Sequence, residues 1–176
     1  MIAKNLATPA LLALVLGGCS TLSDLPTDRV GQASLTLANG VPAGTAQLLS
    51  NGTTVSIAIA VTGIEPGPHG FHLHTTGKCE APGFTSAGGH LNPAGRQHGN
   101  ENPSGKHLGD LPNLVVGANG TATAEFDLVG TRDQVLADIF DADGTAVMIH
   151  AGPDDYRSDP AGDAGSRIAC GVLRPA

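Results

Sequence analysis

Apolar and polar residues alternate along much of the chain from residue 33 onward. In residues 54–61, one face carries only β-branched side chains, namely Val55, Ile57, Ile59 and Val61. Residues 121–128 repeat this alternation, and the segments 33–37 and 45–48 are shorter examples. Period-two alternation predicts antiparallel strands with one face on a core, and the Gly, Asn and Pro residues between the segments predict turns.

Several such strands at short spacing predict an all-β fold, either a sandwich or a flattened barrel. Only residues 131–139 carry a weak helical pattern. Residues 75–111 and 151–166 fit neither pattern, because they are rich in Gly, Pro, Asp and His and contain little strand pattern. Loops of this length in a compact domain are usually functional or disordered. Something must hold these loops in place, and the histidines of the chain indicate what.

The first 18 residues have the composition of an export signal. Lys4 precedes an apolar run that ends at Leu16, and this run is too short to span a bilayer comfortably. Cys19 stands directly after Leu16-Gly17-Gly18, which resembles the lipobox of bacterial lipoproteins, where the cysteine is lipidated and becomes the mature N-terminus. The alternative is an ordinary signal peptide that contains a cysteine.

This interpretation divides the chain into three parts. We expect a lipoprotein signal over residues 1–18, a polar tether over 19–31 and the folded domain over 32–176. The mature protein is then exported to the periplasmic side of the cell envelope, where acyl chains on Cys19 anchor it to a membrane.

Charge and composition exclude several other classes. The chain has 9 Lys and Arg against 16 Asp and Glu, so its formal charge is 9 − 16 = −7, and removal of residues 1–18 takes away Lys4 and leaves −8. An acidic protein lacks the basic face that nucleic acid requires, so we expect no nucleic-acid partner. The 25 Gly and 12 Pro exclude a coiled coil or a long helical bundle. A homodimer is left open.

The export prediction assigns a role to each of the three cysteines. Of the three cysteines, Cys19 is assigned to the lipid, which leaves Cys79 and Cys170 as a pair. An exported protein folds in an oxidising compartment, where a disulfide between such a pair is the default.

All seven histidines lie between residues 69 and 150. His72 and His74 are two residues apart in a strand pattern and therefore share one face, which suits a transition metal. His150 ends the apolar segment 146–149 and could supply a third imidazole. In the first long loop, three nitrogens and one carboxylate make a complete zinc set, namely His90, His98, His107 and Asp110. The alternative is that these are solvated histidines without a metal.

Four sequence strings resemble the copper–zinc superoxide dismutase family: HGFHLH (69–74), FTSAGGHLNP (84–93), HGNENPSGKHLGDL (98–111) and GDAGSRIACGV (162–172). The resemblance runs from about residue 33 to 173. It implies a flattened, eight-stranded antiparallel Greek-key β-barrel with two long functional loops. It also implies one copper and one zinc per chain, and dismutation of superoxide to oxygen and hydrogen peroxide.

The resemblance assigns roles to individual residues. The copper ligands are expected to be His72, His74, His90 and His150. The zinc ligands are expected to be His90, His98, His107 and Asp110, so that His90 bridges both metals. Arg167 corresponds to the arginine beside copper, Asp154 to the carboxylate that links the two ligand sets, and Cys79–Cys170 to the family's disulfide. His69 would face the other side of its strand, and we expect a structural role for it.

Two points weigh on this interpretation. A protein with a charge of −8 repels superoxide, and the 151–166 loop is itself acidic, so Arg167 needs help from Lys78, Arg96 or Lys106. A copper or zinc buffer on the same scaffold and a structural β-domain stabilised by zinc are the rival functions. Arg167 argues against storage, because storage does not require a residue that docks an anion.

Overall fold

The computed structural model describes residues 27–176, so the predicted export signal, Cys19 and most of the predicted tether lie outside the described residues. The strands are β1 (Asp28–Leu37), β2 (Pro42–Ser50), β3 (Val55–Thr62), β4 (Gly67–His69), β5 (Phe71–His74), β6 (Leu114–Val116), β7 (Thr121–Asp127), β8 (Ala146–His150), β9 (Arg167–Val172) and β10 (Arg174–Pro175). The α-helix is α1 (Arg132–Ile139), and η2 (Thr85–Ala87) is a single 3₁₀ turn.

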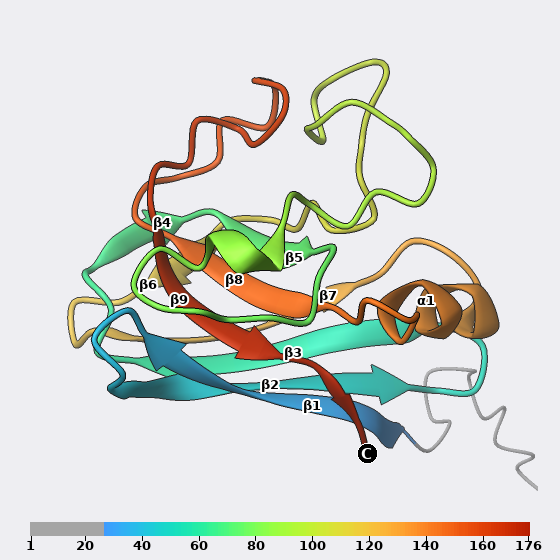
Figure 1. Ribbon diagram of the computed structural model, residues 1–176, viewed down its shortest axis with the longest axis horizontal. Helices are drawn as coiled ribbons and strands as arrows, with labels where there is room; N and C mark the ends of the chain where they lie inside the picture. Colours follow the sequence, from blue (N-terminus) through green and yellow to red (C-terminus); the bar gives the residue numbers. More distant parts are fainter. Residues whose placement is uncertain (1–26) are drawn as a thin grey trace, which may run out of the picture.

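One curled antiparallel sheet makes up most of the molecule. Its strand order is β5-β8-β9-β1-β2-β3-β7, β10 pairs with β1, and β4 and β6 form a separate two-stranded sheet. The curl brings β1, β2 and β3 opposite β5, β8 and β9 (Figure 1). Phe71 of β5 and Phe126 of β7 come from the two ends of the strand order, yet their ring centroids are 5.9 Å apart. The predicted all-β barrel is confirmed as a curled half-barrel.

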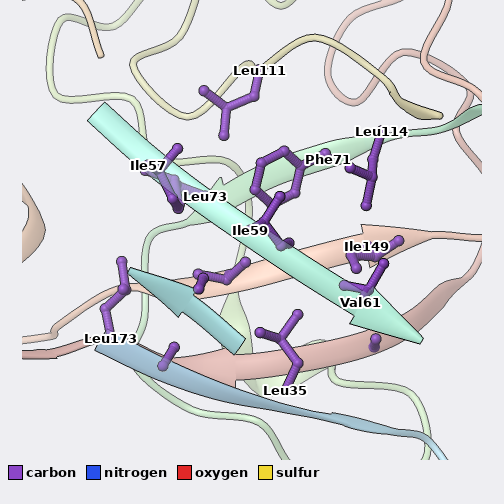
Figure 2. Close-up of a cluster of buried hydrophobic side chains, with 14 of the residues drawn as sticks. Leu35, Ile57, Ile59, Val61, Phe71, Leu73, Leu111, Leu114, Ile149 and Leu173 are labelled. Atoms are coloured by element: carbon purple, nitrogen blue, oxygen red, sulfur yellow. The ribbon is translucent and has the colours of Figure 1, made fainter. Parts of the chain in front are cut away.

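The core lies between these two walls (Figure 2). The β-branched face of β3 is buried as the alternation predicted, and Leu35 of β1 packs into the same cluster. From the other wall, Phe71, Leu73 and Ile149 are fully buried. Burying one such side chain contributes about 1.5–3 kcal/mol. The core therefore holds β5 and β8 rigidly, and these two strands carry three of the seven histidines.

The structure corrects the boundary between tether and domain. β1 begins at Asp28, and it pairs with β2 at Asp28↔Ser50 and with β10 at Gly31↔Pro175. Residues 28–31, predicted as the end of the 19–31 tether, therefore belong to the sheet. The sequence pattern missed them because Asp28 and Arg29 are exposed, and backbone pairing at a strand end does not require apolar side chains.

The helical pattern over residues 131–139 is confirmed by α1, which buries Val135 and Ile139. Within residues 27–176, no helix is long and apolar enough to cross a membrane. The two predicted loops are also confirmed, because only η2 interrupts the connection from β5 to β6, and β8 leads to β9 without a helix or strand. Both loops rise from the same side of the barrel (Figure 1).

Candidate metal centre

Strand alternation places the first histidines. In β5, Phe71 and Leu73 enter the core, so His72 and His74 project from the opposite face. β5 pairs with β8 in the register His72↔Met148, which brings His150 at the end of β8 alongside. The ring centroids of His72 and His150 are 4.9 Å apart. His90 joins them from the loop, and its ring centroid lies 4.0 Å from that of His72.

Four ring nitrogens in this cluster are buried and have no hydrogen-bond partner among the described residues: His72 Nδ1, His74 Nε2, His90 Nε2 and His150 Nε2. The same four residues can offer ligand atoms that lie within 4.8 Å of one another. Buried polar atoms are rarely left without a partner. Four such atoms side by side fit a metal ion that accepts nitrogen ligands, and copper is such a metal.

The protonation states suit metal binding. Burial lowers the pKa of His72 and of His150 to about 4, even though a hydrogen bond to Asp154 and a backbone carbonyl, respectively, partly oppose the shift. Burial also lowers the pKa of His90. These imidazoles are therefore neutral at pH 7, and a neutral imidazole offers a lone pair where an imidazolium would offer a proton.

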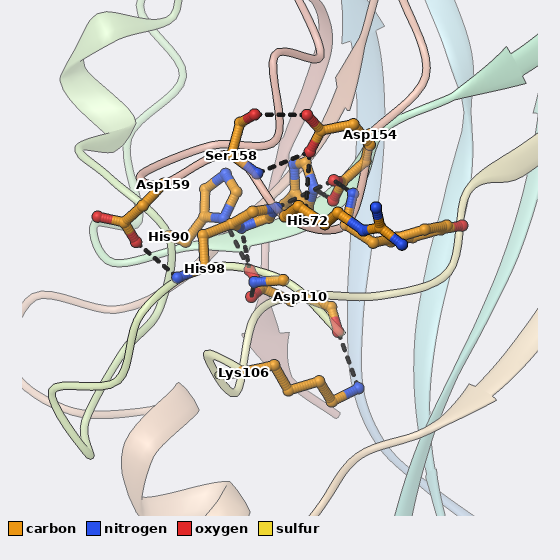
Figure 3. Close-up of polar contacts among 12 residues, drawn as sticks. His72, His90, His98, Lys106, Asp110, Asp154, Ser158 and Asp159 are labelled. Atoms are coloured by element: carbon orange, nitrogen blue, oxygen red, sulfur yellow. Dashed lines mark hydrogen bonds and ion pairs between the residues drawn. The ribbon is translucent and has the colours of Figure 1, made fainter. Parts of the chain in front are cut away.

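A second cluster surrounds one carboxylate oxygen (Figure 3). Asp110 Oδ1 lies 2.8 Å from His90 Nδ1, 3.1 Å from His98 Nδ1 and 3.0 Å from His107 Nδ1. Its other oxygen, Oδ2, accepts hydrogen bonds from the backbone N–H groups of Gly99 and His107. Burial alone would raise the pKa of Asp110, but hydrogen bonds from His90 and His98 outweigh it and hold that pKa far below its usual range. Three nitrogens and one carboxylate oxygen fit the tetrahedral preference of zinc.

One ring belongs to both clusters. His90 directs Nδ1 toward Asp110 Oδ1, and its Nε2 is one of the four unpartnered nitrogens beside His72. His90 therefore contributes one ring nitrogen to each cluster, and the family resemblance implies a bridging role for it.

Asp154 contacts one histidine of each cluster and so connects the two clusters. Its Oδ2 lies 2.7 Å from His72 Nε2, and its Oδ1 lies 3.0 Å from His98 Nε2 (Figure 3). Hydrogen bonds from His72 and His98 outweigh the effect of burial and hold the pKa of Asp154 well below its usual range. Gly162 has φ +67 and packs so closely against Asp154 Oδ1 and His98 Nε2 that a Cβ there would collide with both. Glycine is thus required at 162 by both backbone conformation and space.

Arg167 lies at the start of β9 and is held by the loop beneath it. Its Nη1 donates to the carbonyl of Phe84 and its Nη2 to that of Gly88, both at 2.7 Å. A cavity of about 330 Å³ is lined by Arg167 together with His74, His90, His150, Arg96 and Asp159. Arg96 is thus the one residue of the three predicted helpers that lines this cavity; Lys106 instead donates to the backbone carbonyl of Asp110.

The disulfide expected from the cysteine count is confirmed. Cys79 and Cys170 are bonded, with their Cα atoms 5.7 Å apart. Cys79 belongs to the first long loop and Cys170 to β9, three residues after Arg167. The bond therefore connects the loop under Arg167 to the strand that carries it.

Two further residues, His69 and Asn113, form hydrogen bonds with backbone groups near the clusters. His69 is buried, and its ring nitrogens each lie 2.8 Å from a backbone oxygen, of His150 and of Glu65, which fits the structural role expected for it. Asn113, which sequence analysis missed, exchanges two hydrogen bonds with the backbone of Asp154. An asparagine after Leu-Pro reads as an ordinary turn residue, so no sequence pattern could have singled it out.

Comparisons with known proteins identify the family of this chain. Residues 42–173 match the family model described as copper/zinc superoxide dismutase (SODC). The chain belongs to the copper/zinc superoxide dismutase family. Among curated members, it is 40% identical over 168 residues to superoxide dismutase [Cu-Zn] 2 of Aquifex aeolicus, covering 93% of this chain and 98% of that protein. It is 38% identical over 142 residues to superoxide dismutase [Cu-Zn] of Caulobacter vibrioides, covering 77% and 80%.

Solved structures of copper/zinc superoxide dismutase-like proteins share the fold. The crystal structure of a SOD-like protein from Bacillus subtilis matches with a TM-score of 0.76 and 37% identity over 81% of this chain and 97% of that one. The family uses copper and zinc, and the two ligand clusters described above have the composition that these metals require.

Proposed function

We propose that this chain catalyses the dismutation of two superoxide anions and two protons to oxygen and hydrogen peroxide. The observation that carries the proposal is the set of four buried, unpartnered imidazole nitrogens beside a complete zinc set, with His90 shared between them. When bound, copper supplies two interconverting oxidation states, so one superoxide can be oxidised and the next reduced. Zinc would be held by His90, His98, His107 and Asp110.

His90 is the proposed proton carrier. Its Nδ1 is fixed toward Asp110, whereas its buried Nε2 faces the other cluster, and His90 is one of the residues that line the cavity. Nε2 can therefore take up a proton when it is not engaged as a ligand, and then deliver that proton to the anion being reduced. Asp154 keeps His72 and His98 oriented by accepting hydrogen bonds from their Nε2–H groups.

Arg167 is proposed to bind the substrate anion. Arg167 lines the same cavity as His74, His90 and His150, and two backbone carbonyls hold its guanidinium in place. A fixed cation beside the reacting site compensates locally for the negative charge of the whole protein. Arg96 contributes a second cation to the cavity lining, and Asp159 opposes both with a negative charge.

The test is a metal analysis combined with a superoxide-consumption assay on residues 20–176, loaded with both metals. We expect one copper and one zinc per chain, and rapid superoxide consumption. His150→Ala should lose copper and activity but keep zinc, because His150 belongs to the first cluster alone. Zinc alone after copper loading of an oxidised sample would contradict the copper assignment. Both metals without superoxide consumption would instead favour a metal buffer.

We also propose that the protein is exported and anchored to a membrane through lipidated Cys19, so that it removes superoxide on the periplasmic side of the envelope. The Leu16-Gly17-Gly18-Cys19 sequence supports the anchor, and the Cys79–Cys170 disulfide supports an oxidising compartment. All seven proposed ligand residues come from one chain, so the proposed reaction does not require the homodimer that the sequence left open.

A further inference from the structure

Asp154 must be held in place by its surroundings, because it lies in the irregular loop between β8 and β9. Asn113 holds its backbone on both sides. The N–H of Asp154 donates to Asn113 Oδ1 at 2.8 Å, and Asn113 Nδ2 donates to the carbonyl of Asp154 at 2.9 Å. Asn113 directly precedes β6, so the backbone position of Asp154 beside the two clusters is fixed by a neighbouring part of the fold.

Tyr156 completes this arrangement from the other side. Its backbone N–H donates to Asp154 Oδ1 at 2.7 Å, and its hydroxyl oxygen accepts the backbone N–H of Asn113 at 2.8 Å. The three residues therefore form a closed ring of hydrogen bonds. Tyr156 acts on Asp154 twice, directly through its backbone and indirectly through Asn113.

Tyr156 also meets the loop that carries the zinc set. Its carbonyl accepts the backbone N–H of Glu101 at 3.1 Å. Gly99 lies so close to the Tyr156 carbonyl that a Cβ at position 99 would collide with it, and the N–H of Gly99 donates to Asp110 Oδ2. Tyr156 is thus a junction between Asp154 and the segment that contains His98.

We propose that Tyr156 is a positioning residue, whose hydroxyl fixes Asp154 between His72 and His98 and thereby couples the two metal clusters. The proposal rests on the proposed function only in naming those clusters as metal sites. Tyr156 does not line the cavity beside Arg167, so it acts through Asp154 and not on the substrate. A carboxylate that orients a ligand ring tunes both the direction and the basicity of that ring. A less firmly held Asp154 should therefore alter metal binding at both clusters.

Tyr156→Phe tests this hydroxyl alone. The variant keeps the ring, the Cβ at the left-handed backbone position (φ 63) and the backbone N–H that reaches Asp154. Losing one net hydrogen bond of this kind corresponds to about a two- to tenfold change in an equilibrium or rate. We therefore expect zinc transfer from the zinc-loaded variant to a coloured chelator to be about two- to tenfold faster than from the parent. In the variant loaded with both metals, the visible absorption band of Cu(II) should shift.

Ser158→Ala is the matched control, because it also removes one hydroxyl from this loop. The Ser158 hydroxyl donates a hydrogen bond to the carboxylate of Asp155, not to that of Asp154. It should match the parent in zinc transfer and in the copper band. A Tyr156→Phe protein that differs from the parent only in the melting temperature of the chelator-treated chain would overturn the proposal, since its hydroxyl would then be merely structural. A change at only one of the two metals would overturn the coupling.

The zinc measurement keeps this inference separate from the proposed function. If the parent consumes no superoxide but Tyr156→Phe still speeds zinc transfer and shifts the copper band, the enzymatic proposal fails and the positioning role stands. If the parent is active and the variant is indistinguishable from it in zinc transfer and in the copper band, the positioning role fails and the enzymatic proposal stands.

Discussion

Removing the Cys79–Cys170 disulfide should destabilise the protein strongly when zinc is absent from the sample. The two cysteines are 91 residues apart, and a cross-link of this span restricts the unfolded chain by about 4.6 kcal/mol in the chain-entropy account. This value is an upper bound, because unfolded chains retain some structure. For a domain of this size, about 2–4 °C of melting temperature correspond to each kcal/mol. We therefore expect Cys79→Ser/Cys170→Ser to melt up to about 10–20 °C lower after chelator treatment.

The structure also predicts which part of the site is affected by the loss of the disulfide. Cys170 is buried with Phe84, Ala87 and Met148 in a small apolar cluster, against which Cys79 packs. Arg167 donates to the carbonyls of Phe84 and Gly88 in this same loop. The double variant should therefore lose zinc more readily and misplace Arg167. It should nevertheless fold, because the main core lies elsewhere and zinc can hold the loop independently.

Calorimetry of the chelator-treated proteins measures the effect, and the reduced parent serves as the control, since reduction opens the same bond without replacing either sulfur. The metal-loaded double variant should additionally show reduced superoxide consumption. If the double variant and the parent melt within about 2 °C of each other in chelator and are equally active when loaded with metals, the disulfide is incidental and the reasoning is refuted.

Three further predictions concern the site and the anchor. Arg167→Ala should lower superoxide consumption about ten- to hundredfold, the loss expected for one hydrogen bond to a charged group, and should weaken its salt dependence while both metals remain bound. A parallel fall in copper content would contradict this role. Cys19→Ser should release the protein from membranes without changing the activity of the domain, and mass spectrometry that finds the parent unlipidated would refute the anchor. The chelator-treated protein should lose stability between pH 6.5 and about 4, because burial lowers the pKa of His72 and His150 to about 4 and the unfolded chain binds more protons in this window. A melting temperature that is flat or rises from pH 6.5 to pH 4.5 would contradict this sign.

The sequence predicted those features that depend on local pattern or on spacing. The alternation in β3 and β7 is reproduced by burial, because a strand with one face in the core must alternate. The position of His72 and His74 on one face follows from the same rule. His90, His98, His107 and Asp110 were proposed together from residue type, because three imidazole nitrogens and one carboxylate make a complete set of ligands for zinc, and the structure brings these side chains together.

Other features depend on contacts between distant segments, and no local pattern carries them. Asn113 and Tyr156 are 43 residues apart, and their hydrogen bond exists only because the segment before β6 meets the loop between β8 and β9. Arg96 and Lys106 look equivalent as loop cations, yet one lines the cavity and the other reaches a backbone carbonyl. The start of β1 was missed because Asp28 and Arg29 are polar, although their backbones pair with β2.

The pairing of β1 also separates the proposed reaction site from the point where the chain enters the domain. β9 runs antiparallel to β1 with Ala169 opposite Leu37, so Arg167 lies beyond the far end of β1, whereas the chain enters the domain at Asp28. Ten residues of strand at about 3.3 Å each separate these two points by about 30 Å. This distance exceeds three Debye lengths of about 8 Å at physiological ionic strength. If the proposed anchor at Cys19 holds the domain with Asp28 toward the lipid, the cavity beside Arg167 lies outside the electric field of anionic headgroups, where superoxide is not depleted by the membrane's own charge.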